Sequence, residues 1–234
     1  MTVGSTLLAF DFDGTLAPIH DNPSEVRLNR AAAMLLCQTS QMEGVVVAII
    51  TGRDADDLES RIDAPGAYIV ASHGLEIRGP GGVVVRDTPP LAIEVPPHFR
   101  DEIVASGLRL ESKKHAVALH WRGVSYEANE PLIDRFRAWA RGAELDVIEG
   151  RCVVEARCHG GGKEEALRWL VHAIGAARVF YAGDDITDFG ALRFAAEHGR
   201  ALFVASDERV PPPGVTVVES FRELFRAVRE EVMI

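Results

Sequence analysis

The sequence has few residues of the kinds that crosslink a chain or anchor it in a membrane. It holds three cysteines in 234 residues, Cys37, Cys152 and Cys158, and none of them forms a Cys-x-x-Cys pair. This spacing signals neither a disulfide framework nor a zinc knuckle, and it favours a reducing compartment. Unbroken apolar runs such as Val45 to Ile50 are too short to span a bilayer, and the first Lys or Arg is Arg27. We therefore expect no signal peptide and a cytoplasmic location.

The chain also has fewer basic than acidic residues. The chain has 25 Lys and Arg against 35 Asp and Glu, a formal net charge of -10. Such a charge repels a phosphate backbone and an anionic membrane surface, so we expect neither nucleic acid nor a membrane as a partner. If the substrate is anionic, a bound metal cation is the most economical way to reverse this field locally. The content of 47% hydrophobic and 26% charged residues suits a folded globular protein.

Short apolar runs rich in β-branched or aromatic residues predict buried strands of a parallel sheet. They are Thr6–Phe10, Val45–Ile50, Tyr68–Ala71, Val179–Ala182 and Ala201–Val204. Apolar residues at helical spacing lie between some of them, at Asn29–Cys37 and Glu164–Ile174. This order predicts an α/β protein with a Rossmann-like parallel-sheet core.

The middle of the chain has a different pattern, in which strand candidates alternate apolar and polar residues. They are Leu108–Lys113, Val117–Arg122, Leu145–Glu149 and Cys152–Arg157, with helices expected at His98–Ala105 and Asn129–Arg141. Alternation indicates an antiparallel sheet with one wet face. Because Pro89-Pro90 and Gly160-Gly161-Gly162 punctuate its ends, we expect a smaller α/β domain at 89–161, inserted into a core formed by 1–88 and 162–234.

Two carboxylates follow the first predicted strand, in the segment Asp11-Phe12-Asp13-Gly14-Thr15. Residues two apart in an extended chain project to the same side, and open parallel sheets bind ligands at the carboxyl ends of their strands. Neighbouring carboxylates repel unless a proton or a cation intervenes, and Mg²⁺ is the usual cation beside phosphate. The plainer alternative is a strand that ends in an ordinary Asp-Gly turn.

Three further segments have polar residues at a strand end or a helix start. Thr51-Gly52-Arg53 offers a hydroxyl and backbone amides to an anion, although Thr51 alone is more simply a helix cap. Lys163 follows three glycines at a helix start, but the surrounding residues do not form a nucleotide phosphate loop. Its ammonium is a donor that can reach phosphate oxygens, and the alternative is a solvated surface lysine. Gly183-Asp184-Asp185-Ile186-Thr187-Asp188 ends a buried strand, where its acids would complete a metal site or form a solvated turn.

Taken in order, these segments resemble the four motifs of the haloacid dehalogenase superfamily of phosphatases. The pattern is Asp-x-Asp-Gly-Thr, then Thr-Gly-Arg, then Lys, then Gly-Asp-Asp-x-x-Asp, and it spans essentially the whole chain. An insertion between the second and third motifs looks like the type C2 cap of that superfamily.

The resemblance narrows to the trehalose-6-phosphate phosphatases. Residues 10–19 and the segment Ser72-His73-Gly74-Leu75 are similar to that family, as are Glu111-Ser112-Lys113, residues 117–122 and Val154-Glu155-Ala156-Arg157. Two departures stand out: Ser72 replaces the usual Asn, and Phe189-Gly190-Ala191 replaces Glu-Asp-Ala after the last acidic motif.

The resemblance implies a magnesium-dependent phosphatase that releases phosphate from trehalose 6-phosphate through an aspartyl-phosphate. Asp11 would be the nucleophile and Asp13 the general acid and base, with Thr51 and Lys163 also catalytic. The metal would be held by Asp11, the backbone carbonyl of Asp13, Asp184 and, less directly, Asp188. The substrate would be bound by Gly52, Arg53, His73, Gly74, Glu111, Lys113, His120, Arg122 and Glu155.

Several alternatives remain at this point. One of them is that His120 and Arg122 form only a polar row on the wet face of the sheet. The same chemistry could act on another sugar phosphate, such as sucrose phosphate or a mannosyl-glycerate phosphate, or the chain could be a catalytically idle phosphate-binding module. The expected partner is a small sugar phosphate, and the expected state is a monomer or a weak homo-oligomer.

Overall fold

The computed structural model describes residues 5–20, 25–90, 92–150, 152–205 and 209–232. The chain divides into two compact units, Met1–Thr88 with Gly161–Ile234, and Pro89–Gly160. We call them the core unit and the inserted unit. Within the described residues, no helix combines the length and the apolar character needed to cross a membrane.

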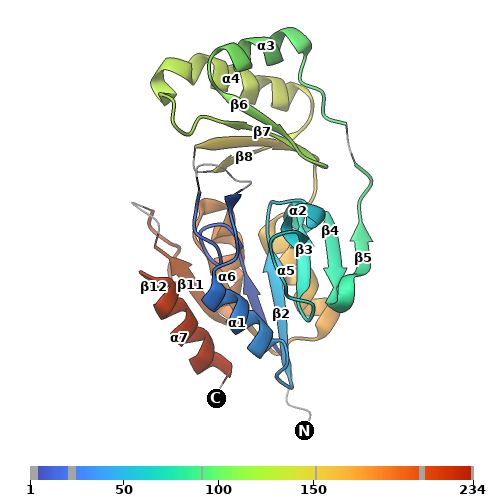
Figure 1. Ribbon diagram of the computed structural model, residues 1–234, viewed down its shortest axis with the longest axis vertical. Helices are drawn as coiled ribbons and strands as arrows, with labels where there is room; N and C mark the ends of the chain where they lie inside the picture. Colours follow the sequence, from blue (N-terminus) through green and yellow to red (C-terminus); the bar gives the residue numbers. More distant parts are fainter. Residues whose placement is uncertain (1–4, 21–24, 91, 151, 206–208, 233–234) are drawn as a thin grey trace. The chain divides into compact units, whose positions relative to one another are not determined.

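The core unit contains an eight-stranded sheet in the order β12-β11-β10-β1-β2-β3-β4-β5 (Figure 1). Its strands are β1 (Thr6–Phe10), β2 (Val45–Ile50), β3 (Tyr68–Ala71), β4 (Glu76–Gly79), β5 (Val83–Asp87), β10 (Arg178–Gly183), β11 (Gly199–Val204) and β12 (Thr216–Val218). Its helices are α1 (Arg30–Thr39), α2 (Ala55–Glu59), α5 (Lys163–Ile174), α6 (Phe189–His198) and α7 (Phe221–Val232), with 3-10 turns η2 (Ser72–Gly74), η3 (Pro80–Gly82) and η4 (Ile186–Asp188).

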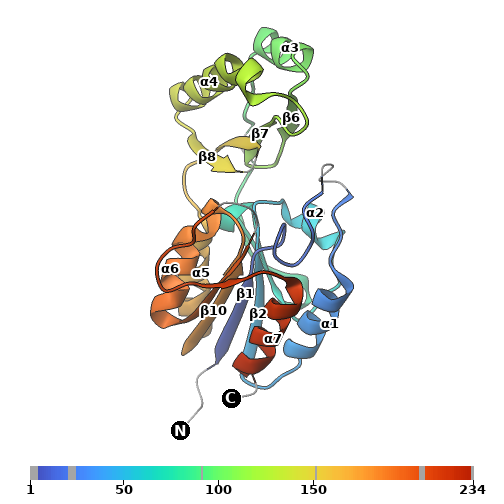
Figure 2. The same cartoon turned by 90° about the vertical axis from the view of Figure 1, so that its left-hand side faces the viewer.

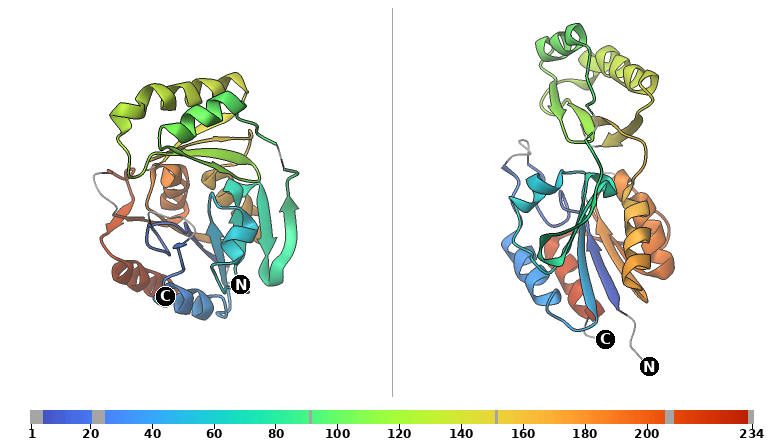
Figure 3. Two further views of the ribbon diagram at one scale, coloured as in Figure 1. Left: turned by 45° about the horizontal axis from the view of Figure 1, so that its top comes forward. Right: turned by 90° about the vertical axis from the view of Figure 1, so that its right-hand side faces the viewer.

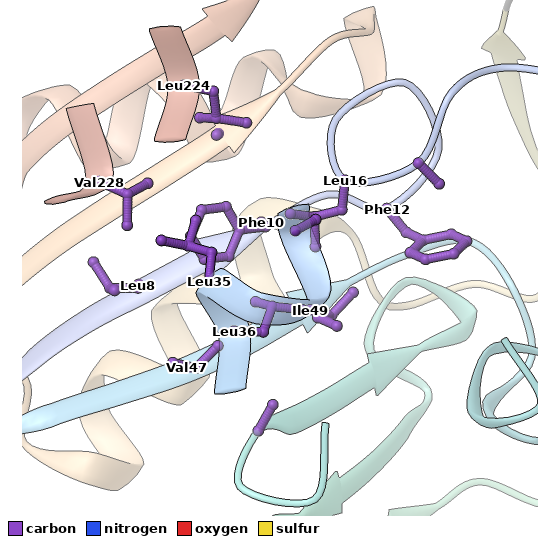
Figure 4. Packing of buried hydrophobic residues seen from close by; sticks show 14 of the residues in the cluster. Leu8, Phe10, Phe12, Leu16, Leu35, Leu36, Val47, Ile49, Leu224 and Val228 are labelled. Atoms are coloured by element: carbon purple, nitrogen blue, oxygen red, sulfur yellow. The ribbon is translucent and has the colours of Figure 1, made fainter. Parts of the chain in front are cut away.

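Helices cover both faces of this sheet. Figure 2 shows α1 and α7 on one side of the sheet and α5 and α6 on the other. The strand β1 explains why, because Leu8 and Phe10 pack into one hydrophobic cluster while Leu7 and Ala9 pack into the other. A strand buried on both faces needs an unbroken apolar sequence, which is what the first predicted strand has. Figure 4 shows the α1 and α7 side of this packing, where Phe10 and Leu8 lie near Leu35 of α1.

The strands from β12 to β3 are parallel, but β4 and β5 extend the sheet with antiparallel pairs. This extension was not predicted from the sequence. The hairpin turns at Pro80-Gly81-Gly82, where Gly81 and Gly82 both have positive φ angles. The valines of β5 are exposed, so their apolar run does not reflect burial.

The inserted unit contains a four-stranded antiparallel sheet in the order β6-β7-β9-β8. Its elements are α3 (Pro97–Ala105), β6 (Arg109–Ser112), β7 (Ala116–His120), α4 (Tyr126–Gly142), β8 (Asp146–Gly150) and β9 (Val153–Arg157). Both helices lie on one face of this sheet (Figure 3) and share a hydrophobic core with it. The predicted antiparallel strands are therefore present, with one correction: β7 ends at His120, so Arg122 lies in the turn that follows, next to Gly123 at φ 83°.

Candidate active site

Three strand ends meet at the carboxyl edge of the core sheet. In the parallel register, Phe10 of β1 stands opposite Ala182 of β10 and Ile49 of β2. The amide of Asp11 donates to the carbonyl of Ala182 at 2.8 Å, which ties the residue after β1 to β10. Because these strands are neighbours and end at the same level of the sheet, the polar residues that follow them gather at one edge.

Asp11, Asp184 and Asp188 form a buried acidic cluster at this edge. One carboxylate oxygen from each lies within 4.8 Å of the others. Asp11 and Asp184 are 4% exposed, and Asp188 is fully buried. Lys163, the first residue of α5, donates from Nζ to Asp11 Oδ1 at 2.6 Å and to Asp188 Oδ1 at 2.7 Å. We call these four residues the acidic cluster.

The charges of the acidic cluster do not balance. Burial is the largest cause that raises the pKa of Asp11, to about 7, against the lowering effect of Lys163. Burial, followed by the charges of Asp11 and Asp188, raises the pKa of Asp184 to about 9. Burial alone would lower the pKa of Lys163, but Asp11 and Asp188 raise it. Three ionised carboxylates and one ammonium (-3 and +1) would leave two surplus negative charges, so the cluster fits a divalent cation with oxygen ligands.

Asp188 is oriented by a group that the sequence analysis missed. The hydroxyl of Tyr181 donates to Asp188 Oδ1 at 2.6 Å, and the amide of Asp185 donates to Asp188 Oδ2 at 3.1 Å. Together with Lys163, these donors fix the carboxylate within the cluster. A tyrosine in the middle of a strand buried on both faces was the available signal, because a buried hydroxyl needs a partner.

Two glycines leave room for the acids of the cluster. A Cβ atom at Gly14, which has φ +87°, would collide with the Asp184 carboxylate. A Cβ atom at Gly183 would collide with the Asp188 side chain. Both segments thus need glycine for close approach, and Gly14 also has a backbone conformation that favours glycine.

Asp13 lies outside the acidic cluster and is paired with Arg53. Arg53 donates from Nε to Asp13 Oδ2 and from Nη2 to Asp13 Oδ1, each at 2.7 Å, and from Nη1 to Asp57 Oδ2 at 2.7 Å. Desolvation would lower the pKa of the guanidinium, but these carboxylates raise it. The bidentate pair fixes the direction of Arg53, and Asp57 is a second residue of this site that the sequence analysis did not single out.

The remaining predicted residues of the core unit surround the end of β2. Thr51 is buried, and its Oγ1 accepts from the amide of Arg53 at 3.1 Å. The amide of His73 donates to the carbonyl of Thr51 at 2.9 Å, and the amide of Gly162 donates to the carbonyl of His73 at 2.8 Å. Gly74 follows His73 with φ +99° and lies against Ala166 of α5. These contacts link the Thr51 loop to the start of the helix that carries Lys163.

In the inserted unit, four predicted residues share the sheet face opposite the helices. The register aligns Glu111 with Ala118, and Ala118 with Glu155, whereas Leu119 and Val154 point into the core. Lys113 Nζ lies 2.5 Å from Glu155 Oε2, and His120 Nε2 lies 2.7 Å from Glu111 Oε2. The hydrogen bond with His120 is the main cause that lowers the pKa of Glu111, against a smaller effect of burial. We call Glu111, Lys113, His120 and Glu155 the polar face; Arg122 lies beyond the strand.

A family model described as trehalose-phosphatase matches residues 9–207 of the chain. The chain belongs to the trehalose-phosphatase family. It is 30% identical over 220 residues to a trehalose-phosphate phosphatase of Mycobacterium marinum, with 89% of this chain and 56% of that protein covered. It is 34% identical over 202 residues to an uncharacterized glycosyl hydrolase of Mycobacterium tuberculosis, covering 79% of this chain but only 15% of that protein. The chain spans about half the length of the trehalose-phosphate phosphatases that it matches.

Solved structures agree on the fold of this family member. The C-terminal domain of trehalose-6-phosphate phosphatase from Candida albicans superposes with a TM-score of 0.75 at 19% identity, covering 96% of this chain and 91% of that one. A haloacid dehalogenase-like hydrolase from Bacteroides thetaiotaomicron gives 0.68 at 16% identity, covering 97% and 99%. The family resemblance and the predicted α/β fold class are therefore confirmed.

Proposed function

We propose that this chain is a phosphatase that hydrolyses trehalose 6-phosphate to trehalose and phosphate. The observation that carries the proposal is the buried acidic cluster with Lys163 at the strand ends, beside the Thr51 loop. Membership of the trehalose-phosphatase family and the names of the mycobacterial relatives support the choice of substrate.

The first step uses Asp11 as the nucleophile. A carboxylate oxygen of Asp11 forms a bond to phosphorus while the bond from phosphorus to the sugar oxygen breaks, which gives an aspartyl-phosphate. Lys163, hydrogen-bonded to Asp11, reduces the repulsion between the two anions. Thr51 and the amide of Gly52 bind the oxygens of the transferring phosphoryl group, and Arg53 belongs to the same loop. Mg²⁺ would be held by Asp11, Asp184 and the Asp13 carbonyl, with Asp188 contributing less directly, and it would offset negative charge on the phosphoryl oxygens.

Asp13 moves the protons. As a general acid it protonates the departing sugar oxygen, and as a general base it then takes a proton from the water that attacks the aspartyl-phosphate, releasing phosphate and free Asp11. Both Asp13 oxygens accept hydrogen bonds from Arg53 in this structure, so proton transfer to the substrate requires at least one of these bonds to break.

We further propose that residues 89–161 act as a cap on a core of 1–88 and 162–234, and that the polar face of the cap binds the sugar. Hydroxyl-rich ligands need hydrogen-bonding side chains, which Glu111, Lys113 and Glu155 supply, with His120 and Arg122 as further candidates. A cytoplasmic protein that is monomeric or weakly self-associating, with no nucleic acid partner, completes the proposal.

A panel of sugar phosphates assayed with Mg²⁺ tests the function. Release of inorganic phosphate is measured from trehalose 6-phosphate, sucrose phosphate, mannosyl-glycerate phosphate and a generic aryl phosphate. We expect the highest kcat/KM with trehalose 6-phosphate. A higher value with another sugar phosphate would overturn the substrate, and no release from any ester would overturn the phosphatase assignment.

A further inference from the structure

The turn η2 holds an unusual backbone directly after β3. Ser72, His73 and Gly74 have φ angles of 47°, 54° and 99°, so three consecutive residues lie in the left-handed region. Only Gly74 is a glycine, and residues with a Cβ atom adopt this region at an energetic cost. A conformation of this kind persists only where surrounding contacts impose it.

Backbone hydrogen bonds impose this conformation from two sides. The amides of Ser72 and His73 donate to the carbonyls of Arg53 and Thr51, at 2.8 and 2.9 Å. The carbonyl of His73 accepts from the amide of Gly162 at 2.8 Å. The turn thus joins the loop proposed to bind the phosphoryl group to the residue that precedes Lys163.

The side chain of His73 packs against the same loop. His73 is 8% exposed. A Cβ atom built on Gly52 would lie 2.5 Å from His73 Nε2 and 2.8 Å from Cε1, distances that real Cβ atoms do not show. Gly52 does not have a left-handed φ angle, so the histidine ring, rather than the backbone, excludes a side chain there.

A matching close approach occurs at the other end of the turn. A Cβ atom built on Gly161 would lie 2.8 Å from the carbonyl oxygen of His73. His73 is therefore in close contact with both glycine-containing segments, one through its ring and the other through its carbonyl.

We propose that His73 is a positioning residue that holds the Gly52 amide and the Lys163 ammonium in the relative geometry needed for phosphoryl transfer. This inference rests on the proposed function. It differs from the direct substrate contact that the family resemblance implies for His73. The ring supports Gly52 from the side where a Cβ would stand, and the carbonyl fixes Gly162 beside Lys163.

The test is a double-mutant cycle between His73 and Gly52. His73→Asn removes the ring but keeps a residue that tolerates a left-handed backbone. We expect kcat for phosphate release to fall about 100-fold, since small displacements of positioning groups have effects of this size. KM should change by less than about threefold, because the lost geometry matters mainly in the transition state.

Gly52→Ala should lower kcat as well, because the new methyl group meets the ring. In the double variant the smaller Asn leaves space for that methyl group. Its kcat should therefore be about tenfold or more higher than the value expected if the fold-losses of the two single variants simply multiplied. Glu144→Asn is the matched control, since Glu144 is exposed in the inserted unit and has φ 55°, and it should leave kcat unchanged.

Assays use trehalose 6-phosphate and the aryl phosphate, with Tm measured for every variant. If His73→Asn does not fold, His73→Gly replaces it, since glycine adopts this backbone without strain. The inference fails if His73→Asn keeps the kcat of the wild-type protein, or if the two substitutions act independently in the double variant. In either case, turnover by the wild-type protein would still support the proposed function. If the wild-type protein releases no phosphate, the proposed function fails, and coupling of the two substitutions in Tm still reports whether the contact exists.

Discussion

The acidic cluster of the core unit and the polar face of the inserted unit balance their charges in different ways. In the cluster, three buried carboxylates lie together with one ammonium, which donates to Asp11 and Asp188. On the polar face, Lys113 pairs with Glu155 and His120 pairs with Glu111, and their side chains are between 10% and 32% exposed. The cluster carries surplus charge where solvent is excluded, whereas the face carries paired charges that are partly exposed, except for the buried Glu155.

This difference separates two kinds of site. Surplus charge in a buried place raises carboxyl pKa values and favours a cation, which suits the cluster for attack on an anionic ester. Paired and partly exposed groups can exchange one hydrogen-bond partner for another with little change in net charge, which suits a neutral sugar. We therefore expect chemistry to depend on the cluster and selectivity on the face.

Asp11→Asn should have the largest effect on turnover, because it removes the proposed nucleophile from the acidic cluster. An amide is a poor nucleophile, so kcat should fall by about 10,000-fold on every phosphate ester, as is typical when a nucleophile is removed. Phosphate release is the measurement, with Tm to show that the variant is folded. Asp63→Asn is the control, because Asp63 is an exposed acid of the same unit. Turnover by Asp11→Asn within about tenfold of wild type would show that another group attacks phosphorus.

Metal removal tests whether a bound cation offsets the surplus negative charge of the acidic cluster. Chelation by EDTA should lower phosphate release by about 1,000-fold or more, and added Mg²⁺ should restore it, because a bound cation supplies several kcal/mol of charge stabilisation in such sites. Restoration by Ca²⁺ or Mn²⁺ but not by Mg²⁺ would correct the identity of the ion.

The same charge surplus predicts how stability depends on pH. In the metal-free protein the pKa values of Asp11 and Asp184 are raised to about 7 and about 9. The folded state therefore binds more protons than the unfolded state between the ordinary carboxyl range and pH 9, so stability falls as pH rises through this window. We expect Tm in EDTA to fall between pH 6 and pH 9, and Mg²⁺ to reduce that slope. An unchanged slope on adding Mg²⁺ would contradict a cation site in the cluster.

The sequence predicted five strands of the core sheet and missed β4, β5 and β12. β1, β2, β3, β10 and β11 read as apolar runs because each lies inside the parallel sheet. β5 forms the edge of the sheet and its three valines are exposed, so its apolar run does not reflect burial as the runs of the inner strands do. Edge strands depend on pairing geometry rather than on burial.

The candidate site shows a similar limit. The acids that follow β1 and β10 were predictable because parallel strands end at one edge. The bonds of Asp13 to Arg53 and of Tyr181 to Asp188 were not, since they depend on side-chain rotamers and on how far each loop extends. Residue types at strand ends thus predicted which chemistry was present, but not which acid the lysine holds.

Glu155→Gln should have an intermediate effect, on the binding of the sugar by the polar face. Loss of the charge removes the partner of Lys113 and weakens a hydrogen bond to the sugar, so KM for trehalose 6-phosphate should rise about tenfold. The aryl phosphate, which lacks the sugar, should keep its KM and kcat. Equal losses on both substrates would contradict sugar recognition by this face.

Glu149→Gln should have the smallest effect and serves as the matched test of the two faces of one sheet. Glu149 stands opposite Val154, so it lies on the helix side, where Arg137 of α4 donates to it from Nε at 2.8 Å and from Nη2 at 3.1 Å. The same change of Glu to Gln thus removes an ion pair from the same sheet, but on the face that should not meet sugar. A partly exposed pair of this kind contributes about 1 kcal/mol or less, so Tm should fall slightly while KM for both esters stays at the wild-type value. A rise in KM as large as that of Glu155→Gln would show that both substitutions act through the stability of the sheet, and that the polar face does not bind the sugar specifically.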